Sequence, residues 1–281
     1  MNTLRRIERK LGFQSLADFD DIVTALDYAA AQGFRALELN LGNPFYLNQL
    51  RSKAQQARIR TRSRKLKIPL LVHSVDSLNY FLSDWKHVRM NLSFMKRIID
   101  CAAHAGAVHY TFHLGMDMRY SFMSAERKYT WELYPEPFER NLRRILVDLR
   151  EYARRLDGMT LGVENVGGFR FAWVFPILDE LLGGRLCLTM DIVHINVYRG
   201  KVFEAENGFF FDHPRLVKSA HIHDNNGKRD EHSVIGAGSI DFLPYFRLLG
   251  AQNAYCIFEV RPKEAAVECL RRFRTGIAPK L

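Results

Sequence analysis

The sequence of 281 residues lacks the features that mark several classes of protein. No apolar run approaches the roughly 18 uncharged residues of a membrane span, so a transmembrane helix is excluded. The basic N-terminus has no apolar core behind it, and we expect no secretory signal. The few cysteines lie far apart without a CxxC pair: Cys101, Cys187, Cys256 and Cys269. We therefore expect buried thiols and a cytoplasmic protein.

Acidic residues are outnumbered, with 31 Asp and Glu against 41 Lys and Arg, which gives a net charge of +10. A basic surface can serve DNA, RNA or phosphorylated metabolites, or can act in solvation alone. The charge therefore leaves the kind of partner open. The hydrophobic share of 47% excludes a chain that is mostly disordered.

Low-complexity segments, sequence repeats and linkers are also missing, but one pattern recurs along the whole chain. Short apolar runs alternate with segments of helical period. The expected strands are 10–16, 34–41, 68–74, 107–114, 159–165, 186–192, 217–223 and 254–260. The expected helices are 18–32, 46–66, 85–105, 136–156, 170–182, 241–249 and 262–274, and we expect the link 195–216 to be irregular.

This alternation predicts an α/β fold, a (β/α)8 TIM barrel that forms a single domain over residues 1–281. A doubly wound open sheet is the alternative. It would usually carry a glycine-rich turn after the first strand, where this chain has QSLADFDD.

Ionisable side chains close most of the expected strands: His73, His113, Glu164, Asp191, His194, His221 and Glu259. In a barrel these ends meet at one face, and buried charges there must be paired or bound to metal. Imidazoles and carboxylates without thiolates suit zinc, manganese or iron. Each residue alone also has a structural interpretation; Asp191, for example, could cap a helix, and Glu259 could pair with Arg261.

Asp230 and His232 share one side of an extended segment and join the candidate ligands. We expect structural or surface roles for the other five histidines: His87, His104, His109, His213 and His223. His223 is the closest to the site, because it follows His221 by two residues and would share its side of the strand.

Several stretches together carry a family resemblance: VHSVDSLNY, TFHLG, GVENVGG, MDIVH, AHIHDNNGKRDEHSVIGAGSIDF and FEVRP. From about residue 10 to about residue 275 the chain resembles the superfamily that joins endonuclease IV-type abasic-site endonucleases (AP endonuclease family 2) with xylose isomerase-like sugar isomerases and epimerases. By that resemblance, one metal is held by His73, His113 and Glu164. A second is held by Glu164, Asp191, His221 and Glu259, and a third by His194, Asp230 and His232.

Two functions follow from the resemblance. The full ligand set favours an endonuclease IV-like phosphoester hydrolase with two or three divalent metal ions (Zn, Mn or Fe), acting on a phosphate-containing substrate such as abasic DNA. The alternative is a metal-dependent sugar or sugar-phosphate isomerase or epimerase, which needs only the second set and uses Glu164 and Glu259 for proton transfer. A third hypothesis, a non-catalytic barrel, would be supported by lost ligands, and none is lost.

The chain also departs from endonuclease IV, because it lacks the glycine- and serine-rich first-strand motif that helps to grip DNA in that family. The ending EVRP on the eighth strand resembles the sugar enzymes more. We predict catalytic roles for Glu164, Glu259 and Asp191. The candidate substrate-binding or supporting residues are Arg261, Lys228, Asn79 and Asn165.

Three further segments are candidates for substrate contact. The basic segment 51–67 could contact phosphates or form an outer barrel helix. Loops 116–136 and 195–214 mix aromatic and basic residues, which could stack bases, close over a sugar as a lid, or simply pack. The first holds Tyr120, Phe122, Tyr129, Trp131 and Tyr134 with Arg119, Arg127 and Lys128. The second holds Tyr198, Phe203 and Phe209 to Phe211 with Arg199 and Lys201.

Overall fold

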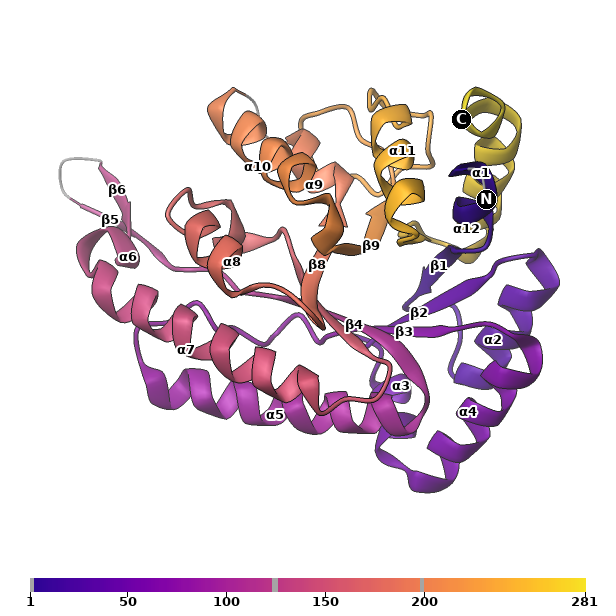
Figure 1. The fold of residues 1–281 in the computed structure, drawn as a ribbon, viewed down its shortest axis with the longest axis horizontal. Coiled ribbons are helices and arrows are strands. Elements are labelled where there is room, and N and C mark those ends of the chain that lie inside the picture. The colour runs from indigo at the N-terminus through magenta and orange to yellow at the C-terminus, as the bar shows by residue number, and fades with distance from the viewer. Residues whose placement is uncertain (1–2, 123–125, 198–199) are drawn as a thin grey trace.

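The computed structural model describes residues 3–122, 126–197 and 200–281 and contains a closed barrel of parallel strands (Figure 1). Its eight strands run in the order β1-β10-β9-β8-β7-β4-β3-β2, and β1 closes the barrel by pairing with both β2 and β10. The strands are β1 (Leu11–Ser15), β2 (Ala36–Asn40), β3 (Leu70–His73), β4 (Ala107–His113), β7 (Thr160–Glu164), β8 (Leu186–Asp191), β9 (Val217–Ile222) and β10 (Tyr255–Phe258). Each lies within one expected strand, so the predicted (β/α)8 barrel is confirmed.

Helices surround the barrel and bury their apolar stripes against it (Figure 1). They are α1 (Thr3–Glu8), α2 (Ile22–Gln32), α3 (Pro44–Arg51), α4 (Lys53–Leu66), α5 (Trp85–His104), α7 (Pro135–Arg154), α8 (Phe175–Leu181), α11 (Leu243–Gln252) and α12 (Lys263–Arg272). The single helix expected over 46–66 is two helices. Ser52 has extended backbone and its hydroxyl accepts from the Gln55 N–H, so it ends α3 and caps α4.

Two segments expected to be loops contain helices or strands. In 116–136, β5 (Arg119–Ser121) pairs antiparallel with β6 (Arg127–Tyr129), and α6 (Thr130–Leu133) follows. In 195–216, α9 (Ile192–Val197) and α10 (Lys201–Asp212) form, so the prediction of an irregular link was wrong. Tyr198 and Arg199 lie outside the described residues.

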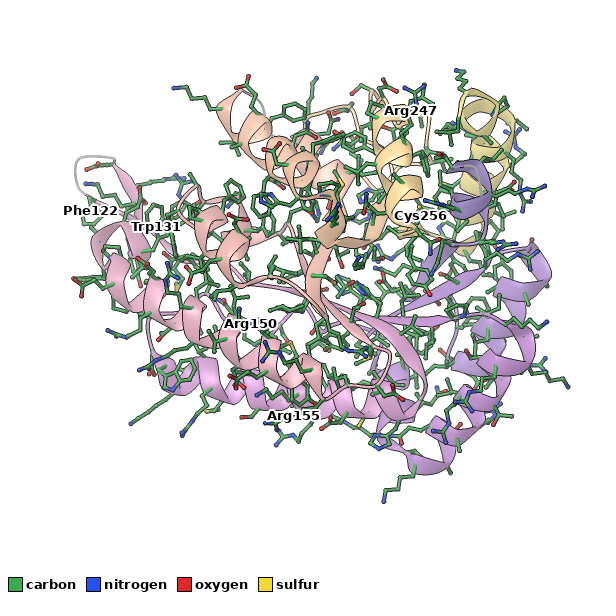
Figure 2. All side chains as sticks on the ribbon, in the orientation of Figure 1. Phe122, Trp131, Arg150, Arg155, Arg247 and Cys256 are labelled. Atoms are coloured by element: carbon green, nitrogen blue, oxygen red, sulfur yellow. The ribbon has the colours of Figure 1, made fainter. Side chains whose placement is uncertain are left out.

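The remaining elements are short turns of helix: η1 (Gly167–Arg170), η2 (Pro214–Leu216), η3 (Phe273–Ile277) and η4 (Ala278–Lys280). Across the part of the chain that the structure describes, no helix combines the length and apolar character that crossing a bilayer requires. Figure 2 shows side chains filling the space between the barrel and its helices, with Arg155 at the end of α7 and Arg247 on α11.

Candidate metal centre

The barrel gathers the predicted ligands at the C-terminal ends of its strands. His73, His113, Glu164 and Asp191 are the last residues of β3, β4, β7 and β8. His221 is the last residue but one of β9, and Glu259 directly follows β10. Because all strands are parallel, these ends meet at the same mouth of the barrel. His194 lies on α9, and Asp230 and His232 lie in the segment between β9 and α11.

Four of these residues form the most compact group. Glu164, Asp191, His221 and Glu259 are buried, and each offers a ligand atom within 4.8 Å of the others. The Nδ1 atom of His221 lies 3.2 Å from Glu164 Oε1, 3.1 Å from Glu259 Oε2 and 3.9 Å from Asp191 Oδ2. Three carboxylates packed this closely repel one another unless a cation lies among them.

The donor atoms of this group fit a divalent metal ion. The Nε2 atom of His221 is 2.8 Å from Glu38 Oε2, so it carries a hydrogen, and in the neutral ring Nδ1 is left with its lone pair toward the three carboxylates. Carboxylate oxygens and an imidazole nitrogen are the donors that zinc, manganese and iron(II) accept. Asp191 divides its carboxylate, because Oδ1 accepts from the backbone N–H groups of Val193 and His194 while Oδ2 faces the group. It therefore caps α9 and serves the site at once.

The imidazoles and carboxylates of this group shift one another's pKa values. Burial raises the pKa of Glu164, but His221 and His113 outweigh it and hold that pKa well below its usual range. Burial lowers the pKa of His221, but Glu38, Glu164 and Glu259 outweigh it and raise that pKa well above its usual range. Burial raises the pKa of Asp191, yet His194 and His223 lower it to about 2.

A second pair of ligands faces the other oxygen of Glu164. The Nε2 atoms of His73 and His113 each lie 3.1 Å from Glu164 Oε2. Asp76 Oδ1 lies 3.8 Å from Nδ1 of His73 and 3.9 Å from Nδ1 of His113. Burial opposes a charge on His73, but Glu164 and Glu38 raise its pKa to about 9. Glu164 therefore stands between two groups, with Oε1 in one and Oε2 in the other.

The third predicted set surrounds Asp230. Its Oδ2 atom lies 3.3 Å from Nε2 of His194 and 3.1 Å from Nε2 of His232. Burial opposes charge on both imidazoles, but Asp191 above all raises the pKa of His194 to about 10, and Asp230 raises that of His232 to about 9. His232 has a φ of 47°, so the segment turns here and does not stay extended as expected.

His223 belongs to the site, although the sequence favoured a structural role for it. It is fully buried, with Nε2 3.1 Å from Asp191 Oδ2, and its ring stacks on His232 at 4.1 Å. Its Nδ1 atom has no hydrogen-bond partner and lies 3.7 Å from Asp230 Oδ1. His223, His232 and Glu259 form a further group that could hold a metal ion. The other four histidines lie outside the ligand groups: His87 and His213 pair with Asp84 and Asp179, His104 bonds the Asp100 carbonyl, and His109 lies inside the barrel.

Two of the four candidate supporting residues reach the ligands. Asn165 clamps the backbone of Asp191, accepting from its N–H at 2.6 Å and donating to its carbonyl at 2.8 Å. Arg261 donates to Gln14 Oε1 at 2.9 Å and lies 3.7 Å from Glu259 Oε1.

The other two lie away from the ligands. The side-chain amide of Asn79 bonds backbone groups, accepting from the Phe81 N–H and donating to the Met116 carbonyl. Lys228 is exposed in the segment between β9 and α11, and no described contact joins its ammonium group to the ligands.

Sequence reasoning missed Glu38 and Glu206. Glu38 is fully buried in the middle of β2 and accepts from His221, Gln14 and Thr111. A glutamate inside the apolar run FRALELNL was the available signal. Glu206 on α10 is buried and accepts from Asn165 at 2.6 Å, while its Oε2 atom has no partner. Burial above all raises its pKa to about 7.

Some residues of two segments that suggested nucleic-acid contact are engaged within the protein. On α4, Arg58 pairs with Asp21, which caps α2, and Arg62 pairs with Asp27 on α2. In the hairpin region, Tyr129 and Trp131 pack against Phe171, with ring centroids 4.9 and 5.0 Å apart.

The exposed side chains of the hairpin region include Tyr120, Phe122 and Tyr134, and Figure 2 shows Phe122 at the outer edge of the molecule with Trp131 behind it. Plain packing therefore accounts for Tyr129 and Trp131, which lie at the base of the hairpin. It does not account for the exposed aromatic residues at its edge.

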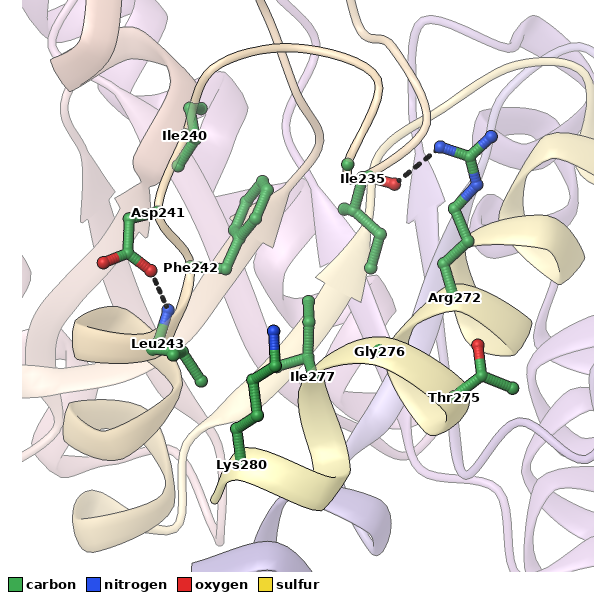
Figure 3. Close-up of a pocket in the computed structure, with 11 residues that line it drawn as sticks. Ile235, Ile240, Asp241, Phe242, Leu243, Arg272, Thr275, Gly276, Ile277 and Lys280 are labelled. Atoms are coloured by element: carbon green, nitrogen blue, oxygen red, sulfur yellow. Dashed lines mark hydrogen bonds between the residues drawn. The ribbon is translucent and has the colours of Figure 1, made fainter.

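A cavity of about 380 Å³ lies away from this chemistry, between the segment 235–243 and the C-terminal residues 272–280 (Figure 3). Ile235, Phe242 and Ile277 give it an apolar wall. Its polar groups are partly engaged, since Arg272 donates to the Ile235 carbonyl and Asp241 accepts from the Leu243 N–H. None of its lining residues belongs to the ligand groups.

Comparisons with known proteins agree with the barrel fold and identify its family. Residues 26–275 match the family described as xylose isomerase-like TIM barrel. Two uncharacterised proteins of Methanocaldococcus jannaschii are relatives. One is 33% identical over 110 residues, which span 38% of this chain and 41% of that protein. The other is 24% identical over 98% of this chain and 94% of that protein.

Solved structures share the fold at low sequence identity. A D-tagatose 3-epimerase-like protein superimposes with a TM-score of 0.75 at 21% identity, covering 94% of this chain and 96% of that one. The 3-keto-D-glucoside 4-epimerase of E. coli gives a TM-score of 0.69 at 18% identity, covering 95% and 99%. A Thermus thermophilus protein soaked with zinc chloride gives a TM-score of 0.67 at 20% identity, covering 95% and 99%.

Proposed function

The chain belongs to the xylose isomerase-like TIM barrel family, and from this premise we propose that it is a metal-dependent epimerase or isomerase of small sugars. The observation that carries the proposal is the group of Glu164, Asp191, His221 and Glu259, whose ligand atoms lie within 4.8 Å of one another. The sugar epimerases among the structural neighbours support it. This reverses the order in which the sequence ranked the two functions, and DNA gains no support as the partner.

The ligand group would hold one divalent ion, which when bound would polarise a sugar carbonyl and the hydroxyl beside it. Glu164 and Glu259 come from β7 and β10, with Asp191 and His221 between them on β8 and β9. We assign these two glutamates to proton exchange with the carbon beside the carbonyl, one from each face of the substrate. A carbon that loses a proton to one glutamate and regains one from the other changes its configuration.

Arg261 and His194 are the groups that would orient the substrate at the mouth of the site. Arg261 is held by Gln14 and lies beside Glu259, so its guanidinium is directed toward one catalytic carboxylate. The Nδ1 atom of His194 is buried without a hydrogen-bond partner and lies 3.7 Å from Glu164 Oε1. Both could hold a hydroxyl or a phosphate of the sugar.

The experiment is a proton-exchange assay on a panel of ketoses and ketose phosphates in deuterium oxide. Metal-free protein is prepared with a chelator and reloaded with manganese, zinc or iron(II). The proposal predicts deuterium at the carbon beside the carbonyl only in the reloaded protein. Absence of exchange with every sugar and metal, in protein shown to bind metal, would contradict the proposed reaction.

A second candidate is the phosphoester hydrolase, favoured by one observation. Glu164 Oε2 faces His73 and His113 while Oε1 faces the first group, an arrangement suited to a carboxylate shared by two ions. Elemental analysis separates the two functions, since the hydrolase needs two or three ions per chain and the epimerase one. Cleavage of an abasic-site oligonucleotide, inhibited by chelator, would establish the hydrolase.

A further inference from the structure

A chain of hydrogen bonds runs through the barrel interior on the same strands that carry the ligands. His109 and Thr111 precede His113 on β4 by four and two residues, so all three project to one face of the strand. Thr189 precedes Asp191 by two in the same way. Gly162 makes room for the chain, because a Cβ there would lie 2.3 Å from Thr189 Oγ1 and 2.7 Å from His109 Nε2.

The bonds link residues of four strands, β7, β4, β8 and β2, and pass through β4 twice. Thr160 Oγ1 lies 2.7 Å from His109 Nδ1, and His109 Nε2 lies 2.9 Å from Thr189 Oγ1. Thr189 Oγ1 lies 3.0 Å from Thr111 Oγ1, which lies 3.4 Å from Glu38 Oε1. His109, Thr111, Thr189 and Glu38 are all fully buried, so water does not compete for these bonds.

The chemistry of Glu38 fixes the direction of every bond in the chain. Three donors surround its carboxyl group, and a carboxylate only accepts. Thr111 therefore gives its one hydrogen to Glu38 and must accept from the Thr189 hydroxyl. Thr189 in turn accepts from Nε2–H of His109. Nδ1 of His109 then accepts from the Thr160 hydroxyl at 2.7 Å, a shorter contact than the 3.4 Å from that hydroxyl to the Val108 carbonyl oxygen. All the donors thus point toward Glu38.

A shorter branch connects Glu38 to the mouth of the site. Gln14 Oε1 accepts from Asn40 at 3.1 Å and from Arg261 at 2.9 Å. Its amide oxygen is therefore occupied, and its NH₂ group faces Glu38 Oε2 at 3.1 Å. Glu38 Oε2 also accepts from His221 Nε2 at 2.8 Å. One buried carboxylate thus joins the interior chain, Arg261 and a candidate metal ligand.

We propose that Glu38 is a positioning residue that holds His221 with Nε2 protonated and Nδ1 presented to the metal ion. The proposal deepens the proposed function and rests on its metal site. A carboxylate behind an imidazole ligand fixes the ring's tautomer and orientation and makes the ligand nitrogen more basic. Glu38 itself is held by Gln14 and Thr111, which donate directly to its two carboxylate oxygens.

Metal binding tests the proposal without a substrate. Manganese affinity is measured by chelator competition for wild type, Glu38→Gln and the matched control Thr189→Val, a near-isosteric change in the same interior chain two bonds from Glu38. We expect Glu38→Gln to weaken binding by about 10- to 100-fold. We expect Thr189→Val to bind as wild type does. Wild-type affinity in Glu38→Gln would overturn the proposal, and so would an equal loss in both variants.

Histidine nitrogen NMR gives a second readout that a merely structural role would not move. In wild type, His109 carries its hydrogen on Nε2. In Glu38→Gln the new amide can donate to Thr111, which reverses the chain and moves the hydrogen of His109 to Nδ1. A hydrogen on Nδ1 instead of Nε2 of His221 in zinc-loaded wild type would overturn the proposal even if Glu38→Gln fails to fold.

The result for wild type also separates the two proposals. Wild-type protein that binds no metal overturns the proposed function together with this inference. Wild-type protein that binds metal as tightly as Glu38→Gln overturns the inference alone.

Discussion

The residues around the two carboxylate oxygens of Glu164 differ in their solvent exposure. On the Oε1 side, the side chains of Asp191 and His221 are inaccessible to solvent and that of Glu259 is 10% exposed. On the Oε2 side, the side chain of His113 is 19% exposed and that of Asp76, which faces both imidazoles, is 64% exposed.

The supports behind the two sides differ as well. Glu38 holds the far nitrogen of His221, and Asn165 holds both backbone polar groups of Asp191. Behind His73, the partner is the backbone carbonyl of Ser74. A ligand braced by buried polar groups loses less freedom when a metal binds. We therefore expect the proposed metal ion to bind on the Oε1 side, and an ion on the Oε2 side to bind more weakly.

The largest expected effect is a loss of activity when Glu164, which both sides share, is substituted. Under the proposed function, Glu164→Gln and Glu259→Gln each remove a proton-transfer group and should lower the epimerisation rate by about 10²- to 10⁴-fold. His113→Gln changes only the Oε2 side of Glu164 and should lower the rate less than about tenfold. Steady-state rates with the best sugar of the panel, and circular dichroism for folding, provide the check. A loss in His113→Gln equal to that in Glu164→Gln would favour the hydrolase.

Metal affinity should separate the two sides next. Asp191→Asn removes a charged ligand from the Oε1 side and should weaken the tightest metal site by more than about 100-fold. This loss exceeds that expected when a residue supporting a ligand is removed. His73→Gln should leave that site unchanged and remove only a weaker ion. Calorimetric titration of metal-free protein resolves the two classes. Equal affinities for the sites in wild type would contradict the difference.

The pH dependence of stability sharpens the comparison without any mutation. In metal-free protein the pKa values of His73 and His194 are raised to about 9 and about 10. A raised imidazole pKa contributes stability that is complete below the unfolded value of about 6.5 and is lost as pH rises through the folded value. The free energy of unfolding should therefore fall between pH 6.5 and about 10.

Urea unfolding of metal-free and metal-loaded protein measures this fall. Bound metal replaces the protons, so the loaded protein should show a smaller decrease over the same range. His73→Gln should remove part of the decrease in the metal-free protein. A free energy of unfolding that rises toward pH 9.5 in metal-free protein would contradict this prediction.

The smallest expected effect concerns the support of Asp191 from α10. The pKa of Glu206 is raised to about 7, so the folded protein keeps a proton there that the unfolded chain loses near pH 4.5. Wild type should lose stability between these values, and Glu206→Gln should not. The variant should gain at least about 1 kcal/mol relative to wild type between pH 5 and pH 8. Denaturant unfolding at both values decides this, and no relative gain would refute it.

Local pattern was enough to predict the strands and the residues at their ends. Each expected strand contains one strand of the barrel, and ionisable residues at the ends of apolar runs marked the mouth. Glu38 was beyond this reasoning. It lies on β2, and its partner His221 lies on β9, with β1 and β10 between them in the barrel. Their contact exists only because the closed barrel brings opposite strands together across its interior.

The helices α9 and α10 show the other limit. The link 195–216 was expected to be irregular, and it is rich in aromatic residues, which favour helices only weakly. Tertiary packing decides the structure instead. Phe210 stacks on Phe169 with centroids 5.7 Å apart, and Phe209 stacks on Phe175 at 5.1 Å. These partners lie before β8 in the chain, so no local pattern contained them.

The central claim is that one divalent ion sits among Glu164, Asp191, His221 and Glu259. Anomalous diffraction from crystals of protein reloaded with a single equivalent of manganese tests it most directly. The account predicts one strong peak in contact with these four side chains. A peak in contact with His73 and His113 on the Oε2 side of Glu164, or no peak among the four residues, would contradict it.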